Sequence, residues 1–182
     1  MAWWHCRRLM SRGLLLFALC AGPAAPAADA TQSFDDWAVG TADDNSYVYA
    51  ATVNDSGEAF GEYCYFASGT CTWLFAIHTA CNPNSLGNIL ANSDSSSVPL
   101  EIKCLAPFGK DLYTYAFTSW QTLEGNIRDA SRVGFAMALE GDKFKVIRFS
   151  LKGRSSATQV VEGYFLKAVK ERQDKGTKDE TL

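Results

Sequence analysis

The sequence has little of what catalytic or membrane-spanning proteins need. It contains two histidines, of which only His78 lies outside the first thirty residues. It has no Gly-x-Ser-x-Gly nucleophile elbow, no phosphate-binding Walker loop, no dinucleotide fingerprint and no EF-hand ladder. Its apolar run over residues 13–20 is far shorter than the ~20 residues of a bilayer-spanning helix. The sequence therefore contains no recognisable catalytic or cofactor-binding motif and no apolar segment long enough for a transmembrane helix.

The first thirty residues have the pattern of a secretory signal peptide. Arginines at positions 7, 8 and 12 precede the apolar run, and small residues follow it over 21–30. We predict cleavage after Ala30, or after Ala27 or Ala28. A retained membrane anchor and a lipid-modified Cys20 are the less favoured alternatives. The mature protein is predicted to be periplasmic or secreted, in a Gram-negative bacterium.

The rest of the chain divides into one domain and a tail. Residues 31–169 have the length of a single disulfide-bonded β-rich domain, and residues 170–182 alternate charges without apolar anchors, which predicts a disordered tail. The full chain has a net charge of −3, and loss of the arginine-rich leader makes it more negative. This charge argues against nucleic acid as a partner.

Cysteine usage predicts two disulfides. Cys64, Cys71, Cys81 and Cys104 remain after residues 1–30 are removed, and an even count in an exported chain favours disulfides. Residues 67–70 form a turn signal, so a hairpin would place Cys64 opposite Cys71. We therefore predict the pairs Cys64–Cys71 and Cys81–Cys104.

Zinc is the competing interpretation of the same residues. Cys64, Cys71, His78 and Cys81 could supply three thiolates and an imidazole. The spacings are not those of Cys-x-x-Cys knuckles, and this set would leave Cys104 without a partner. We predict disulfides and no metal site.

Short alternating segments predict a mainly β fold, an antiparallel sandwich or barrel-like domain. Turn signals separate these segments, notably over residues 54–57, 92–97 and 140–143. The predicted strands cover residues 36–39, 47–53, the segment around Cys64, 71–78, 88–91, 100–104, 112–118, 133–139 and 144–151.

Two segments are predicted to be helical. Residues 121–130 form one short internal helix with Ser119 as a cap. Residues 157–169 form a C-terminal helix in which Ser156 and Gln159 make a capping box. Its apolar stripe is predicted to pack on the β-structure and consists of Val160, Val161, Tyr164, Phe165 and Ala168.

His78 and scattered carboxylates are the candidates for chemistry. We favour a structural role for His78, and a hydrolase using His78 with Asp94 or Asp111 is the alternative. The adjacent pairs Asp35/Asp36 and Asp43/Asp44 are predicted to be solvated surface.

Aromatic residues are the candidates for binding. Trp37, Trp73 and Trp120 could form a carbohydrate-binding platform, although most aromatics are expected in the core. Six tyrosines occur as i, i+2 pairs, so each pair shares one face of its strand. These tyrosines are Tyr47, Tyr49, Tyr63, Tyr65, Tyr113 and Tyr115. The alternation of residues along a strand does not decide whether the shared faces point to the solvent or to the core.

Two segments resemble those of a known family. Residues 34–39 read Phe-Asp-Asp-Trp-Ala-Val, and residues 132–139 precede a strand and a terminal helix. Both are similar to the bacterial invasion-associated locus B family, although Gly40 and Thr41 stand where that family commonly has a cysteine. The resemblance implies a β-rich envelope or periplasmic protein with a non-enzymatic role near the host or cell surface.

The sequence therefore predicts an exported, non-catalytic binding or accessory protein that is not an enzyme. Its partner is expected to be a protein or an envelope component, in a virulence, stress or hydrolase-inhibiting role. A small hydrolase and a carbohydrate-binding module are the alternatives. The sequence alone does not identify ligand-binding residues.

Overall fold

The fold was determined from a computed structural model that describes residues 32–176, except 110, 140 and 142. The predicted signal peptide lies outside the described residues, as do residues 177–182.

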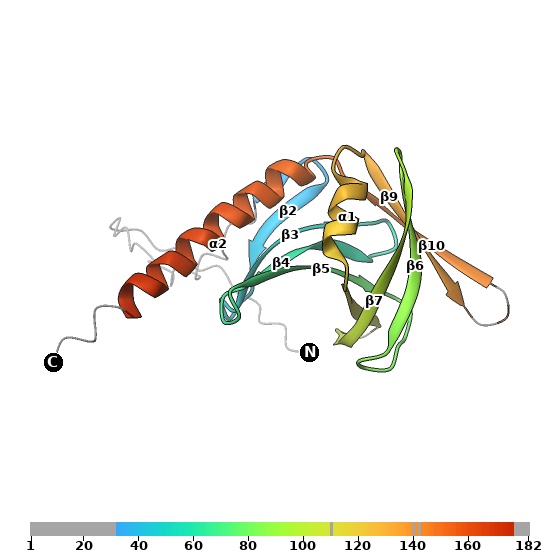
Figure 1. The fold of residues 1–182 in the computed structure, drawn as a ribbon, viewed down its shortest axis with the longest axis horizontal. Coiled ribbons are helices and arrows are strands. Elements are labelled where there is room, and N and C mark those ends of the chain that lie inside the picture. Colours follow the sequence, from blue (N-terminus) through green and yellow to red (C-terminus); the bar gives the residue numbers. More distant parts are fainter. Residues whose placement is uncertain (1–31, 110, 140, 142, 177–182) are drawn as a thin grey trace, which may run out of the picture.

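One antiparallel sheet makes up most of the molecule (Figure 1). Its strand order is β1-β2-β3-β4-β5-β8-β7-β6-β9-β10, so β1 and β10 are the edges. The strands are β1 (Gln32–Phe34), β2 (Trp37–Thr41), β3 (Tyr47–Val53), β4 (Ala59–Tyr65), β5 (Thr70–Ile77), β6 (Leu86–Ser93), β7 (Ser97–Phe108), β8 (Leu112–Phe117), β9 (Arg132–Leu139) and β10 (Lys143–Ser150).

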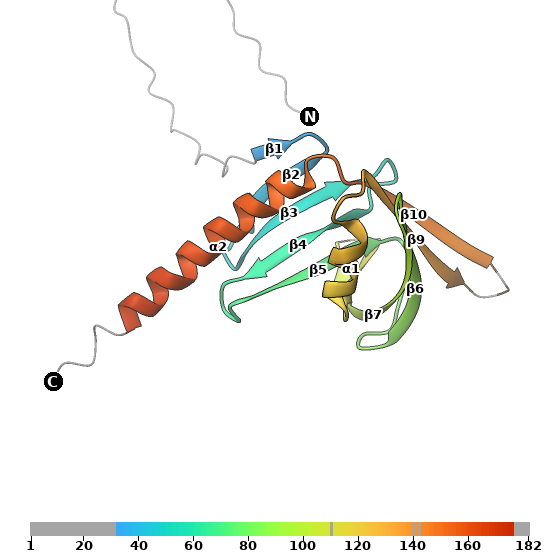
Figure 2. The same cartoon turned by 45° about the horizontal axis from the view of Figure 1, so that its top comes forward.

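The sheet curls until its two ends meet, as Figure 2 shows from a second side. The indole Nε1 of Trp37 on β2 donates a hydrogen bond of 2.9 Å to the carbonyl oxygen of Ser150 on β10. The Ser150 hydroxyl donates to Asp36 Oδ2 at 2.6 Å. The structure is thus the barrel-like form of the predicted mainly β fold, with one sheet folded onto itself.

An aromatic core fills the concave side of this sheet. Alternation places one residue in two on that side, and the inward positions of different strands meet there. The ring centroid of Phe60 lies 5.0 Å from that of Trp73, 5.2 Å from that of Phe135 and 5.4 Å from that of Phe149. These contacts join strands from both halves of the sheet, so the curl itself encloses the core.

Two helices cover the concave side (Figures 1 and 2). Helix α1 (Trp120–Ile127) lies over β6 and β7 and buries Leu123 and Ile127. Helix α2 (Arg154–Gly176) lies over β1 to β4 and buries Ala157, Val161 and Phe165. The middle of the sheet, around β5, lies between the two helices.

The start of α2 differs from the prediction. The helix begins at Arg154, so Ser156 and Gln159 lie inside it and the predicted capping box is wrong. Gly153 precedes the helix with a φ of +84°, and a Cβ there would collide with the carbonyl of Phe34. Glycine therefore lets the chain turn against β1 and begin the helix earlier. At α1, Ser119 is at the N-cap but its side chain makes no capping hydrogen bond.

The stripe and the end of α2 also differ from the prediction. Val161 and Phe165 are buried as expected, but Val160 and Tyr164 are exposed at the edge of the stripe. The helix continues beyond residue 169 into the segment that was expected to be a disordered tail. There the guanidinium carbon of Arg172 lies 5.2 Å from the ring centroid of Phe66, a cation–π contact between this part of the helix and the β domain.

The structure forms both predicted disulfides. Cys64 and Cys71 are direct cross-strand neighbours on β4 and β5, as the hairpin spacing predicts. Cys81 and Cys104 connect the loop after β5 to β7. None of the helices in the described ranges has the length and apolar character needed to cross a bilayer.

Candidate functional site

A cavity of about 460 Å³ lies on the concave side, between the two helices. Helix α2 supplies one wall and the N-terminal end of α1 supplies another, while β4 and β5 form the base. Its lining residues are Glu62, Thr70, Cys71, Trp73, Trp120, Glu162, Phe165 and Leu166.

The cavity is largely apolar and open at its rim. Trp73 is 2% exposed and Phe165 is 6% exposed, so both belong to the inner walls. Trp120 and Leu166 are 46% and 65% exposed and stand on opposite helices. An enclosed aromatic interior with exposed apolar side chains at the mouth is typical of a site that receives an apolar group.

Glu62 places a carboxyl group at the base of this cavity. It follows Phe60 by two residues on β4, so the strand directs both side chains to the concave side. Glu62 is only 8% exposed, and its Oε2 has no hydrogen-bond partner among the described residues. A buried polar atom without a partner is rare in folded proteins, so this oxygen is the feature of the cavity that needs an explanation.

The surroundings of Glu62 favour its neutral form. Burial raises the pKa of this carboxyl to about 7, and the carboxylates of Glu162 and Glu124 add to the effect. The guanidinium of Arg154 opposes it. Below about pH 7 the side chain is therefore mostly protonated and can donate that proton in a hydrogen bond to a ligand.

Arg154 is committed to α1 instead of the cavity. It is 7% exposed, and its guanidinium lies 3.6 Å from a carboxylate oxygen of Glu124. It also donates a hydrogen bond of 3.0 Å to the carbonyl oxygen of Arg128. This contact fixes the first turn of α2 against α1, and so sets the distance between the two walls of the cavity.

Cysteine ligands for a metal are not available at this site. The ligand atoms of Glu62, Cys64 and Cys71 lie within 4.8 Å of one another. However, Cys64 and Cys71 form a disulfide, and Cys81 of the alternative zinc set pairs with Cys104. The structure therefore contradicts the zinc interpretation, because zinc needs thiolates.

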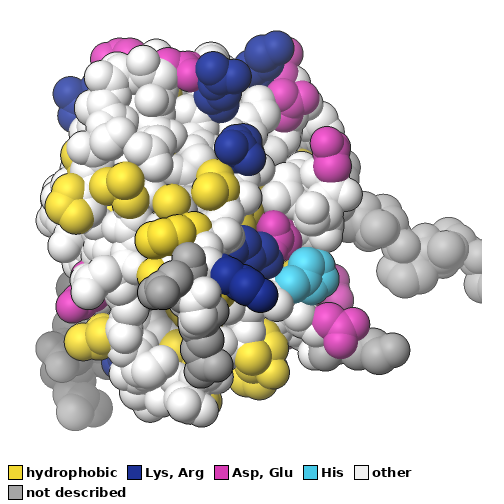
Figure 3. All heavy atoms as spheres, turned by 90° about the vertical axis from the view of Figure 1, so that its right-hand side faces the viewer, with side chains coloured by type: hydrophobic (Ala, Val, Ile, Leu, Met, Phe, Trp, Pro, Cys, Tyr) yellow, Lys and Arg dark blue, Asp and Glu magenta, His cyan; other side chains and the backbone are white. Residues whose placement is uncertain are grey.

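His78 lies at the surface, and among the described residues its ring is hydrogen-bonded to neither Asp94 nor Asp111 through a carboxylate. Its ring Nδ1 is 3.1 Å from the backbone carbonyl oxygen of Asp111, and its Nε2 is 3.1 Å from that of Ser56. Figure 3 shows the histidine (cyan) beside basic and acidic side chains. A backbone carbonyl oxygen lies within hydrogen-bond distance of each ring nitrogen, and one N–H of the ring can donate to one of them, so the ring bridges two loops. This is the structural role we favour.

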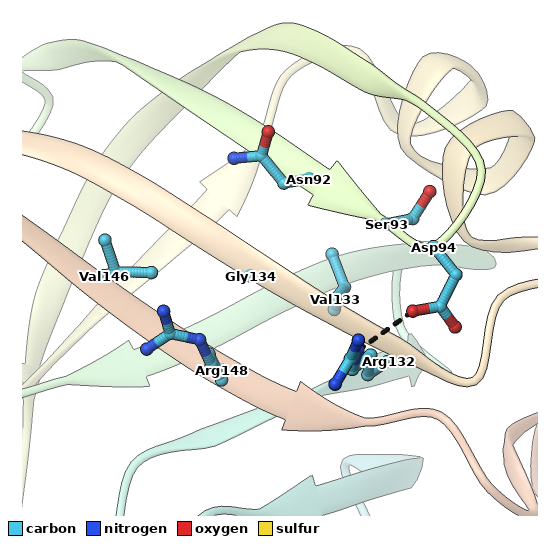
Figure 4. Close-up of a pocket in the computed structure, with 8 residues that line it drawn as sticks. All are labelled: Asn92, Ser93, Asp94, Arg132, Val133, Gly134, Val146 and Arg148. Atoms are coloured by element: carbon cyan, nitrogen blue, oxygen red, sulfur yellow. Dashed lines mark hydrogen bonds and ion pairs between the residues drawn. The ribbon is translucent and has the colours of Figure 1, made fainter.

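Asp94 lines a separate open groove of about 730 Å³ (Figure 4). It accepts hydrogen bonds from the Ser131 hydroxyl at 2.5 Å and from the Ser131 amide at 2.8 Å, and Arg132 Nε lies 3.0 Å away. The Ser131 hydrogen bonds, with Arg132, lower the pKa of Asp94. This carboxylate joins the β6–β7 turn to β9 and does not meet His78.

Two of the four paired aspartates accept hydrogen bonds that stabilise local structure. Asp36 accepts the Ser150 hydroxyl described above, and Asp44 Oδ1 accepts a hydrogen bond of 3.0 Å from the Ser46 amide. Asp35 has a φ of +47° in the turn between β1 and β2.

The structure separates the three predicted tryptophans. Trp37 and Trp73 are 1% and 2% exposed and belong to the core, so neither can form a surface platform. Trp120 alone is exposed, at the rim of the cavity. Tyr115 points inward and donates to the carbonyl oxygen of Thr79 at 2.9 Å, whereas the tyrosines of β3 and β4 share the outer face.

Comparison with known proteins identifies a solved structure that has the same fold. No family model matches the chain, and no curated protein matches it. A solved structure of invasion associated protein B from Bartonella henselae superposes with a TM-score of 0.54 at 14% identity. The match covers 74% of this chain and 97% of that chain. It supports the weak resemblance seen in the two sequence segments, and it shows that the fold is shared over most of the chain.

Sequence reasoning missed Glu62. A signal for it was present, because Glu62 alternates with Phe60 and Cys64, which are core residues. A carboxylate at a core position of a strand is unfavourable unless it has a specific role.

Proposed function

We propose that this chain is an exported, non-catalytic binding protein of the bacterial envelope, and that its concave cavity receives the apolar part of a ligand. The observation that carries the proposal is the carboxyl group of Glu62, which is buried in an apolar cavity with one oxygen unpartnered.

The chemistry of the cavity defines the ligand class. Indole and phenyl rings provide apolar contact, and the neutral carboxyl group of Glu62 provides one hydrogen-bond donor at the base. A suitable ligand is an apolar molecule or chain that carries a hydrogen-bond acceptor. Its acceptor would satisfy Glu62, and its apolar portion would cover Trp120 and Leu166.

An extracytoplasmic location fits the covalent structure. Two disulfides are stable in oxidising compartments, and the fold is shared with an invasion-associated bacterial protein. The predicted signal peptide supplies the route for export. A hydrolase using His78 is not proposed, because among the described residues the His78 ring is hydrogen-bonded to backbone carbonyls and to neither candidate carboxylate.

The test uses a neutral fluorescent probe, N-phenyl-1-naphthylamine, whose emission increases in apolar sites. We expect saturable binding to the mature protein, weakened about tenfold by Trp120→Ala and by Leu166→Ser. Phe144→Ser is the matched control, since Phe144 is an exposed apolar residue on β10, outside the cavity. It should leave binding unchanged.

Two results would overturn the proposal. The first is an absence of saturable probe binding to the folded protein. The second is equal loss of binding in the cavity variants and in Phe144→Ser, because that pattern indicates non-specific adsorption to apolar surface.

A further inference from the structure

Strand β10 leaves one edge of the sheet open. The other edge is β1, which has only three residues and lies against α2. Strand β10 has eight residues, pairs with β9 in continuous register and contains neither a proline nor a bulge. In Figures 1 and 2 the β9–β10 hairpin extends away from the other strands. A long edge without such protection can pair with another strand.

The free backbone groups of this edge belong to Phe144, Val146 and Arg148. The amide of Leu151 donates to the carbonyl oxygen of Ser131 at 2.9 Å, so the odd-numbered positions of β10 are the ones that bond to the β9 side. The even-numbered residues therefore direct their N–H and C=O groups away from β9. In the described parts of the chain, these groups of Phe144, Val146 and Arg148 have no partner.

Space for a second strand is available beside this edge. The sheet closes on itself at the end of β10, where the carbonyl oxygen of Ser150 accepts the indole hydrogen bond from β2. Next to this contact lies an open groove of about 650 Å³, which is lined both by Arg148 of β10 and by Val53 at the end of β3. Phe144 and Val146 are 73% and 45% exposed, so the described chain leaves this part of the edge uncovered.

The side chains of the edge are complementary to those of a second copy. Phe144, Val146 and Arg148 share the exposed face of β10, and the Arg148 guanidinium makes no hydrogen bond or ion pair within the described ranges. In an antiparallel pair of two β10 strands with Val146 on the two-fold axis, the two Val146 side chains are neighbours. Phe144 of each copy then lies beside Arg148 of the other, where a guanidinium–phenyl contact is favourable. All three unpaired residues meet unpaired residues, which gives about six backbone hydrogen bonds.

The other two-fold registers are less favourable. An axis at Lys145 would place two lysines opposite each other, and an axis at Arg148 would do the same for two arginines. An axis at Ile147 would pair Phe144 with Ser150, whose carbonyl oxygen is already bonded to β2. An axis at Phe144 would place Arg148 beyond the end of the second strand. Charge and backbone pairing therefore both select the register centred on Val146.

The remaining charge of the strand is compatible with this register. Lys145 lies on the opposite face of β10 and would stand beside Ile147 of the second copy. Its ammonium group is 2.6 Å from a carboxylate oxygen of the buried Glu58, so its charge is balanced within its own chain. In this register no cation of the paired segment faces another cation.

We propose that two copies of this chain associate through the free edge of β10, as an antiparallel pair centred on Val146. The pairing joins two ten-stranded sheets into one continuous sheet. It gives Phe144 and Arg148 the partners that each lacks in a single chain. The interface is at the edge of the sheet and the Glu62 cavity lies between the helices, so association is independent of the ligand proposed there.

Analytical ultracentrifugation of the mature protein measures the association. We expect a reversible dimer with a Kd in the micromolar range, because the paired segment is short and the interface small. Val146→Lys places two like charges next to each other on the axis and should weaken the dimer at least about tenfold. Val160→Lys is the matched control, because Val160 is a valine of α2 with 37% exposure, away from the edge. It should associate as the wild type does.

Disulfide trapping tests the register. Residues that face each other in a hydrogen-bonded antiparallel pair have Cα atoms about 5.5 Å apart, which is within the range of a disulfide. Val146→Cys should therefore form cross-linked dimers on mild oxidation with copper phenanthroline. Phe144→Cys should cross-link to Arg148→Cys when the two variants are mixed, but not to itself.

Melting temperatures of the variants check that the fold is intact. A protein that stays monomeric at millimolar concentration would overturn the proposal, and so would a dimer that Val146→Lys leaves unchanged. Cross-linking of Phe144→Cys to itself, without cross-linking of Val146→Cys, would overturn it as well, because it requires another register. Binding of the naphthylamine probe to Val146→Lys reports on the cavity separately and should match that of the wild type.

Discussion

The indole nitrogen of Trp37 donates to the carbonyl oxygen of Ser150, 113 positions further along the chain. This bond joins β2, near one edge of the sheet, to the end of β10 at the other edge. Trp37 also packs against Phe60 and Trp73, with ring centroids 6.0 Å and 6.1 Å away. One side chain thus links the closure of the sheet to its core.

Replacement of Trp37 by phenylalanine should destabilise the protein by roughly 2–4 kcal/mol. The change leaves the Ser150 carbonyl without its donor and leaves a void beside Phe60. Urea denaturation measures the loss. Trp120→Phe is the control, and because Trp120 is half exposed it should change the free energy of unfolding by less than about 0.5 kcal/mol. Equal effects of the two changes would show that Trp37 does not hold the sheet closed.

The carboxyl group of Glu62 should make stability depend on pH. Its pKa is about 7 in the folded protein against an ordinary value of 4.5, so the folded state holds the proton more tightly. The stability that this proton provides is fully present below about pH 4.5 and is lost as the pH rises to about 7. The loss amounts to roughly 3 kcal/mol.

Glu62→Gln should remove this pH-dependent loss, since glutamine stays neutral. Unfolding curves recorded between pH 4.5 and pH 8 measure the difference. Glu171→Gln, at an exposed position on α2, is the control and should keep the wild-type slope. Parallel pH profiles for the wild type and Glu62→Gln would contradict the assignment of a neutral carboxyl group to this position.

The two disulfides should contribute unequally. Their sequence separations are 7 and 23 residues, and the chain-entropy model gives about 2 kcal/mol for the shorter loop and about 3 kcal/mol for the longer one. Replacing both cysteines of each pair by alanine and comparing midpoints of denaturation tests the order. Mass mapping of the non-reduced protein checks the pairing, and a peptide linking Cys64 to Cys81 would contradict it.

Two truncations should separate the parts of α2. Removal of residues 154–182 exposes the core under Val161 and Phe165, and it should cost at least about 4 kcal/mol. Removal of residues 170–182 takes away Arg172 above Phe66, which should cost less than about 1 kcal/mol. Thermal denaturation measures both. An unchanged melting temperature after the longer truncation would mean that α2 does not stabilise the domain.

The strands and disulfides were predictable because both depend on local patterns. The alternation over residues 47–53 is reproduced by β3, and the hairpin turn places Cys64 opposite Cys71. The start of α2 was not predictable in this way. It depends on Gly153 lying against Phe34, a contact between positions far apart in the sequence.

The candidate sites were harder to predict than the fold. Alternation shows that Tyr47 and Tyr49 share a face, but the direction in which the sheet curls decides that this face is the outer one. Glu62 becomes unusual only when α2 covers β4 and removes water from its carboxyl group. Both features arise from the packing of whole elements, which a single sequence does not encode locally.

The position of β1 bears on the predicted cleavage of the signal peptide. This strand begins at Gln32, pairs with β2 through Val39, Ala38 and Trp37, and brings the Phe34 carbonyl against Gly153. Cleavage beyond residue 31 would shorten the outermost strand, and cleavage beyond Phe34 would also remove the residue that lies against Gly153 at the start of α2. Each of the three predicted cleavage positions lies before this limit, so all of them would release a chain that retains the complete sheet.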